Sequence, residues 1–192
     1  MRITGARTAK AATAAALAVP LAFGGAAAQS HAQSPSPSPS GPFGPGCSAL
    51  SQKADTAKDK VIEAAAAYPQ LSQFVAASVR ARLNSTLDGK PSITVFVPNN
   101  QAFQQVDKAQ LVSLLGNDGQ LKKVLTYHVV DKRITPDELS KGSFTTVEGG
   151  KLTTSGSGTD FTVNGKAHIV CGNIKVANAT VYVVDSVLRP PS

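Results

Sequence analysis

The sequence predicts a domain of the α+β class, with helices in its first half and strands in its second half. Between Lys53 and Leu115, apolar residues recur at intervals of three and four, which is typical of helices that bury one face. After Tyr127, short segments rich in β-branched residues are separated by glycine-containing turns, which is typical of strands. Because the two kinds of segment do not alternate regularly, the pattern favours α+β over a parallel, doubly wound sheet.

Residues 1–28 have the three parts of a secretory signal peptide. Basic residues within positions 2–10 precede an uncharged, alanine-rich run, and Ala26–Ala28 supply a cleavage site. A second candidate site follows Ala32. A retained membrane anchor would need about 20 apolar residues, and Pro20 interrupts a shorter run. We therefore expect a secreted protein, extracellular or loosely associated with the cell envelope, without a transmembrane anchor.

Residues 29–46 are predicted to form a Ser/Pro-rich spacer that precedes a domain spanning residues 47–192. From Ser34 to Gly46, serine or glycine alternates with proline. This composition favours the polyproline II helix, which advances about 3.1 Å per residue and would span about 40 Å here. Such a segment is not expected to join a core. Whether it works as a spacer or is only a tail left by cleavage stays open at this stage.

The chain contains two cysteines, Cys47 and Cys171. Because a secreted protein folds in an oxidising compartment, we predict that they form a disulfide. Closing a loop of 124 residues is expected to stabilise the fold by about 5 kcal/mol, less any strain in the native state. Two free thiols are the alternative, which a thiol titration without reductant would detect.

Two helices are predicted at the start of the domain. The first spans Lys53–Ala67 and ends before Pro69, and the second spans Leu71–Val79 with basic residues near its end. A turn is then expected at Asp88-Gly89.

A buried strand is predicted over Ile93–Val97, and it stops at the proline that follows. Asn99 or Asn100 is expected to cap the next short helix, because an asparagine side chain can accept hydrogen bonds from the free amides of a first turn. Apolar residues continue at helical spacing as far as Leu115, and Gly116–Gly119 are predicted to end this helix.

Strand-forming segments punctuated by glycine follow from Tyr127 onward. One capped helical turn is expected among them, because Thr135 can act as the cap, Pro136 suits the first position and Glu138 stands three residues after the cap. The predicted strand segments are residues 127–131, 143–148, 151–156, 160–165, 167–172, 173–180 and 181–188.

Three stretches carry a resemblance to a known family. ITVFVPNNQAF (Ile93–Phe103) and LKKVLTYHVV (Leu121–Val130) resemble the two signatures of fasciclin domains, and NATVYVVDSVLRPP (Asn178–Pro191) resembles their closing strand. The order and separations also match, and the cysteine-containing segments are similar to small secreted single-domain fasciclin proteins of actinobacteria. The departures are mild, since Val97 stands where alanine is usual and Asn99 where threonine is common.

The resemblance implies a β-wedge of about seven strands with several helices packed against it. It also implies a role in adhesion or matrix interaction rather than catalysis. In animal members of the family the Tyr-His region has been associated with cell-surface receptor binding, which would place a recognition site around Tyr127 and His128.

Periodicity leaves two orientations open for His128. In a continuing helix it shares one face with Leu121 and Leu125, and in a strand it shares a face with Val130. Both orientations give it apolar neighbours, so the leading role is a neutral imidazole, hydrogen-bonded to backbone inside the core and sensitive to pH through burial. Tyr127 is expected to pack its ring and to keep its hydroxyl for solvent or a partner.

No catalytic motif stands out in the sequence. It has no Gly-x-Ser-x-Gly elbow and no His-Glu-x-x-His pair, and beyond the predicted cleavage sites the histidines are His128 and His168, too few for an ordinary histidine-based zinc site. We therefore predict a protein that is not an enzyme, with no catalytic residues, metal or cofactor. A Ser-His-Asp set assembled in space, with Asp131 near in sequence, is the alternative.

Basic residues flank the Tyr-His pair at positions 122–123 and 132–133, and loss of the signal peptide would leave 16 Lys and Arg against 12 Asp and Glu, a net charge of +4. No aromatic residues interleave with these cations, so nucleic acid is not an expected partner. An unknown protein or an anionic envelope or matrix glycan is expected instead, bound by a monomer. Carriage of a small apolar ligand between helices and wedge is the alternative function. The predicted binding residues are Tyr127, His128, Lys122, Lys123, Lys132 and Arg133.

Overall fold

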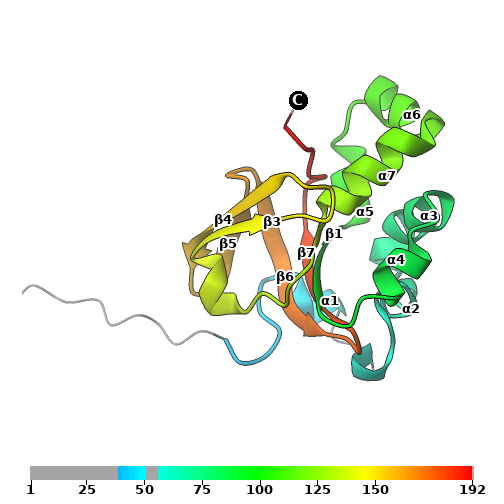
Figure 1. Ribbon diagram of the computed structural model, residues 1–192. Helices are drawn as coiled ribbons and strands as arrows, with labels where there is room; N and C mark the ends of the chain where they lie inside the picture. Colours follow the sequence, from blue (N-terminus) through cyan, green and yellow to red (C-terminus); the bar gives the residue numbers. More distant parts are fainter. Residues whose placement is uncertain (1–38, 51–55, 192) are drawn as a thin grey trace, which may run out of the picture. The chain divides into compact units, whose positions relative to one another are not determined.

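The computed structural model describes residues 39–50 and 56–191 (Figure 1). The predicted signal peptide, and residues 29–38 of the predicted spacer, lie outside these ranges. Their roles therefore stay predictions. Within the described ranges, no helix is both long enough and apolar enough to cross a membrane.

Short helices fill the first part of the described chain. The helix predicted over Lys53–Ala67 is wrong in its extent, because Lys60 is extended with a ψ of 166° and helix α2 begins only after it. The second predicted helix is confirmed as α3, which buries Phe74 and Ala77. The elements of this part are α1 (Cys47–Leu50), η1 (Thr56–Lys58), α2 (Val61–Ala66), η2 (Pro69–Leu71), α3 (Ser72–Arg80) and α4 (Asn84–Asp88).

Side-chain caps start each of the next three helices, because an exposed first turn leaves amides without partners inside the helix. Asn99 accepts a hydrogen bond from the Ala102 amide at 2.8 Å, which confirms the predicted cap. Near residue 135, the Glu138 carboxylate accepts from the Thr135 amide at 3.0 Å, as the predicted helical turn requires. These helices are α5 (Asn100–Gln104), α6 (Lys108–Gly116) and α7 (Asp118–Tyr127), and the turn is η3 (Pro136–Leu139).

Within the described residues, seven strands form one sheet in the order β2-β1-β7-β6-β5-β4-β3. β1 and β7 are parallel, and the other neighbouring strands are antiparallel. A bridge between Val130 and Thr146 joins the two ends of this order, so the sheet nearly closes on itself. The predicted α+β class and the number of strands are both confirmed. The strands are β1 (Ile93–Pro98), β2 (Val129–Val130), β3 (Lys141–Thr145), β4 (Lys151–Ser157), β5 (Asp160–Val163), β6 (Ala167–Lys175) and β7 (Ala179–Val184).

The predicted strands over residues 167–172 and 173–180 are wrong in their bounds, because β6 runs from the first segment into the second and ends at Lys175, and the last residues of the second segment begin β7. The register of β6 against β7 shifts twice between Ile169 and Ile174. Asn173, which lies in this irregular stretch, has a positive φ of 57°. The strand therefore continues through an irregularity that the glycine in the sequence had suggested was a turn.

The strands at the centre of the sheet are buried on both faces. β1 and β7 bury every one of their residues. Because side chains alternate along a strand, Val95 of β1 packs with the helices in one cluster, whereas Phe96 packs inside the closing sheet in a second cluster. Figure 1 shows α2, α3 and α4 on one side of β1 and β7, with β3, β4 and β5 on the other.

Residues 39–46, which we call the N-terminal strap, correct one prediction. Phe43 is only 4% exposed, and its backbone exchanges hydrogen bonds with Gly172 at 3.1 and 2.7 Å. A Cβ atom at Gly172 would lie 2.6 Å from the Phe43 ring, so this glycine leaves room for the aromatic side chain. The prediction that residues 34–46 stay out of the core is therefore wrong for Phe43.

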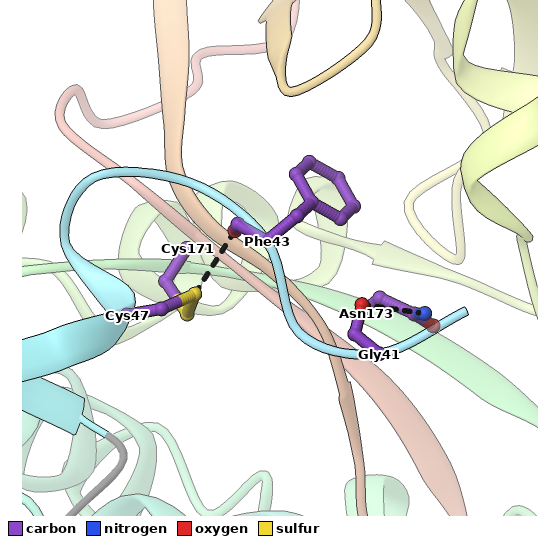
Figure 2. Close-up of a disulfide and its surroundings, with 5 residues drawn as sticks. All are labelled: Gly41, Phe43, Cys47, Cys171 and Asn173. Atoms are coloured by element: carbon purple, nitrogen blue, oxygen red, sulfur yellow. Dashed lines mark hydrogen bonds between the residues drawn. A yellow bond between two sulfur atoms is a disulfide. The ribbon is translucent and has the colours of Figure 1, made fainter. Parts of the chain in front are cut away.

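The disulfide between Cys47 and Cys171 is confirmed, with the two Cα atoms 4.8 Å apart. It joins the residue after the strap to β6, next to the Phe43 site (Figure 2). The Asn173 side-chain amide adds a hydrogen bond to the Gly41 carbonyl at 3.2 Å. A covalent bond and polar contacts thus hold the strap against β6.

Candidate functional site

The end of α7 carries the Tyr-His pair. The helix spans Asp118–Tyr127, and His128 is its C-terminal cap with helical dihedral angles, directly before β2. The helical alternative is therefore the correct one, and it places His128 on the buried side with Leu121 and Leu125.

His128 has no exposed surface. Its Nδ1 lies 2.8 Å from the Val124 carbonyl oxygen, and its Nε2 accepts a hydrogen bond from the Leu188 amide at 3.0 Å. A neutral ring with its proton on Nδ1 satisfies both contacts. Burial lowers the pKa of His128 to about 4, and the hydrogen bond to Val124 partly offsets this effect. The imidazole therefore links α7 to the last residues of the chain.

Tyr127 is 1% exposed. Its hydroxyl donates to the Lys151 carbonyl at 2.7 Å and accepts from the Asn164 side-chain amide at 3.0 Å. The expectation of a hydroxyl kept for solvent or a partner is wrong, since both contacts are with the protein itself. The binding roles predicted for Tyr127 and His128 stay predictions, and neither ring offers a surface for direct contact.

The predicted basic residues do not share one environment. Lys122 and Lys123 are exposed on α7, and Lys123 Nζ lies 3.5 Å from a Glu148 carboxylate oxygen. Lys132 forms an ion pair with Glu138, an interaction that lowers the pKa of the Glu138 carboxyl. Their binding role also stays a prediction.

Arg133 departs from the other three basic residues. It is half-buried, and its guanidinium donates to the Ala177 carbonyl oxygen at 3.0 Å. This contact fixes the side chain against the loop before β7. Lys122, Lys123 and Lys132 are therefore the more accessible members of the predicted set.

Two cavities that the sequence did not reveal adjoin residues 185–191, which we call the C-terminal segment. One has a volume of about 420 Å³ and lies against the loop between α5 and α6 and the turn between β5 and β6. The other, of about 540 Å³, lies between α6 and α7. Gln110 and Arg189 line both, and Arg189 donates to the Gln110 side-chain oxygen at 2.7 Å. We call the two cavities together the C-terminal groove.

The sequence held only a faint signal for this groove. Arg189 precedes a double proline, which keeps the backbone extended, but nothing in the local pattern shows which residues face it. Lys166 lies in a hairpin turn and Gln110 on a helix, so their common location depends on the tertiary structure.

The described part of the chain offers few groups suited to catalysis or metal binding. No group of three or more His, Cys, Asp or Glu that could hold a metal ion occurs within residues 39–50 and 56–191. His168 lies on an exposed part of β6, 3.8 Å from Asp160. The expectation that the protein is not an enzyme stays a prediction about its activity.

Comparison with known proteins gives a consistent picture. A family model described as "Fasciclin domain" matches residues 69–190. The chain is 35% identical to immunogenic protein MPB70 of Mycobacterium bovis over 162 residues, which cover 78% of this chain and 82% of that one.

Further similarities extend this result. Cell surface glycolipoprotein MPB83 of Mycobacterium bovis is 38% identical over 157 residues, covering 79% of this chain and 67% of that one. Protein sll1483 of Synechocystis sp. is 33% identical and covers 75% of this chain and 81% of that one. Among solved structures, a FAS1 domain pair from the insect cell adhesion molecule fasciclin I matches with a TM-score of 0.53 and 17% identity, over 64% of this chain and 46% of that one.

Proposed function

The chain belongs to the fasciclin family, and from this premise we propose that it is a secreted, non-catalytic module that mediates adhesion through an anionic polymer of the cell envelope or extracellular matrix. The observation that carries the proposal is the family match over residues 69–190. A family can share a fold and differ in partners, so the class of partner rests on the charge and surface of this chain.

The relatives support a location outside the cytoplasm. One relative is described as a cell surface glycolipoprotein, and the solved structure with a similar fold comes from a cell adhesion molecule. The predicted signal peptide and the disulfide between Cys47 and Cys171 fit the same location, because disulfides persist in oxidising compartments.

The charge of the chain supports an anionic partner. After loss of the predicted signal peptide, basic residues exceed acidic ones by four, and Lys122 and Lys123 are exposed on α7. Exposed cations attract a polyanion through long-range electrostatics, and salt screens this attraction. Binding should therefore be strong at low ionic strength and weak at high ionic strength.

Calorimetric titration of the purified secreted protein with hyaluronate, at two salt concentrations, tests this function. Raising the salt from about 0.05 M to about 0.5 M shortens the Debye length about threefold, and the affinity should fall steeply. Neutral dextran is the control polymer and should not bind. An affinity for hyaluronate that does not change with salt would contradict an ionic partner.

A matched pair of variants tests the predicted residues. Replacing Lys122 and Lys123 together by glutamine should weaken hyaluronate binding severalfold, since each exposed ion pair is worth roughly 0.2–1 kcal/mol. Replacing Lys58 and Lys60 together by glutamine, both exposed in the first part of the domain, removes the same two charges elsewhere and should have little effect. Equal losses in both variants would mean that only the net charge matters.

A cavity between helices and sheet favours carriage of a small apolar ligand as a second candidate function. This cavity has a volume of about 490 Å³ and is lined by apolar side chains that include Leu50, Leu71 and Val183. Its volume lies within the range of small-molecule sites. Native mass spectrometry of the secreted protein should show a retained mass if the protein is a carrier, and the bare chain if it is not.

A further inference from the structure

The C-terminal groove is built from segments that are far apart in the sequence. Gln105 lies in the loop between α5 and α6, and Gln110 lies on α6. Asn164 and Lys166 come from the turn between β5 and β6, and Arg189 comes from the C-terminal segment. The second cavity continues along Arg189 toward α7. Volumes of about 420 and 540 Å³ are within the range of small-ligand sites.

The buried Tyr-His pair holds two of these segments in place. The Tyr127 hydroxyl accepts from the Asn164 side-chain amide at 3.0 Å, and the Asn164 side-chain oxygen in turn accepts from the Thr153 amide at 2.9 Å. These bonds fix the turn between β5 and β6, where Asn164 has a positive φ of 52°. His128 fixes the C-terminal segment through the Leu188 amide. The groove walls are therefore preorganised from inside the core, which lowers the entropic cost of binding.

The charges that line the groove favour an anionic ligand. The basic residues that line the groove are Lys123, Lys166 and Arg189, and the acidic residue that lines it is Asp107. The Asp107 carboxylate caps α6 by accepting hydrogen bonds from two first-turn amides at 2.9 and 3.2 Å. Its negative charge is thus engaged at the positive end of a helix dipole.

The polar groups of the groove suit a sugar better than a lipid tail. Side-chain amides of Gln105, Gln110 and Asn164 line the first cavity, and Gln120 lines the second. Each of the three glutamine amides can both donate to and accept from a hydroxyl group, whereas the Asn164 amide is held by Tyr127 and Thr153 and shapes the wall. An apolar tail placed over them would remove their water and replace none of its hydrogen bonds, which is unfavourable.

We propose that the C-terminal groove binds an acidic polysaccharide, with the Arg189 guanidinium contacting a sugar carboxylate and the amide side chains contacting neighbouring hydroxyl groups. The proposal rests on the proposed function, because it names the site and the ligand class for the anionic partner. Arginine suits this role because its planar guanidinium can form two parallel hydrogen bonds to a carboxylate.

Calorimetric titration with an oligogalacturonate of defined length tests the site, using the purified secreted protein and charge-removing variants. Arg189→Gln should lower the affinity roughly tenfold or more, since hydrogen bonds to charged groups are the stronger ones. Lys166→Gln should lower it roughly two- to fivefold. The matched control is Lys175→Gln, which removes the same charge from an exposed position on β6 and should leave the affinity within twofold.

A further variant tests the positioning role of the core. Tyr127→Phe keeps the ring but removes the hydroxyl that holds Asn164, so it should weaken oligogalacturonate binding severalfold at a temperature where the protein is fully folded by circular dichroism. A tyrosine that served stability alone would leave the affinity of the folded protein unchanged.

Amide chemical shifts locate the bound oligogalacturonate independently of the variants. Shifts should concentrate at the groove-lining residues 105–110, 120–124, 164–166 and 186–189. Shifts confined to residues 131–133, or an equal loss for Arg189→Gln and Lys175→Gln, would overturn the groove assignment while leaving an anionic partner in place. Failure of the wild-type protein to bind any acidic polysaccharide would instead refute the partner class of the proposed function, and the groove assignment with it. Equally tight binding of polyphosphate would show recognition of charge alone and would refute a polysaccharide site.

Discussion

Acidification from pH 7 to pH 5 is expected to destabilise the fold through His128. Burial lowers the pKa of this imidazole from 6.5 to about 4, whereas in the unfolded chain it takes up a proton near its ordinary pKa. Over this window the unfolded state therefore binds more protons than the folded state, so the free energy of unfolding falls as the pH falls. The stability is fully present above pH 6.5 and is lost progressively toward pH 4.

The magnitude follows from the two pKa values. A shift from 6.5 to about 4 corresponds to about 3 kcal/mol in total, at about 1.4 kcal/mol per pH unit, and about 2 kcal/mol of this is lost between pH 7 and pH 5. Protonation would also prevent Nε2 from accepting the Leu188 amide. The pH 5 limit avoids Glu138, because Lys132 holds the pKa of that carboxyl below 4.5.

Urea unfolding at pH 7 and pH 5 measures this effect in the wild type and in two variants. His128→Gln should be less stable at pH 7, by roughly 1–3 kcal/mol for unpaired buried groups, but should lose little further stability at pH 5. His168→Gln, which removes an exposed imidazole, should keep the pH dependence of the wild type. A wild type equally stable at both pH values, or a pH dependence that disappears in His168→Gln, would refute the role given to His128.

Three further predictions concern stability. Phe43→Ala should lower the free energy of unfolding by roughly 3–5 kcal/mol, because it empties a buried site. The control Pro42→Ala, at an exposed position, should change this free energy little. Similar values for the two variants in urea unfolding would contradict the burial of the strap. Replacing Cys47 and Cys171 together by serine should lower the same free energy by roughly 2–5 kcal/mol, and an unchanged unfolding midpoint would argue against a stabilising disulfide. Asn99→Ala should lower the free energy of unfolding by about 1 kcal/mol, because α5 loses its cap. Thermal unfolding measures this loss, and the control Asn99→Ser should retain most of the stability.

The N-terminal strap is held against the domain from its first described residue onward. Hydrogen bonds from the Asn173 side chain reach the carbonyl groups of Pro39 and Gly41, and the disulfide follows only a few residues later. Residues 39 and 41 are therefore held beside β6. Part of the predicted spacer is in this way a structural part of the domain.

Several features that depend on neighbours in sequence were predicted correctly, although the extent of the first helix was not. The Asn99 cap and the Thr135–Glu138 turn are made by residues three positions apart, so the local pattern contains both partners. His128 lies four residues after Val124, whose carbonyl it contacts, and helical and strand periodicity both placed it among apolar residues. The disulfide was also predictable, because the chain offers a single pairing of its two cysteines.

Features that depend on distant partners were not predicted. Phe43 stands in a segment whose proline and glycine content indicates an extended chain, and its site exists only because Gly172, far along the chain, leaves space for the ring. The partners of the Tyr127 hydroxyl lie 24 and 37 residues away, so the sequence assigned that hydroxyl to solvent or a partner instead.

By itself, the sequence determined the fold class, the family resemblance, the helix caps and the disulfide, because each rests on composition, short spacing or a unique pairing. Only the tertiary structure decided that Tyr127 is buried, that Phe43 completes the core and that Arg189 and Lys166 line one groove. The physical reason is that local hydrogen bonds and periodic burial are encoded within a few residues. The walls of a groove, in contrast, come from segments that meet only after the sheet has nearly closed and the last residues have been fixed against His128.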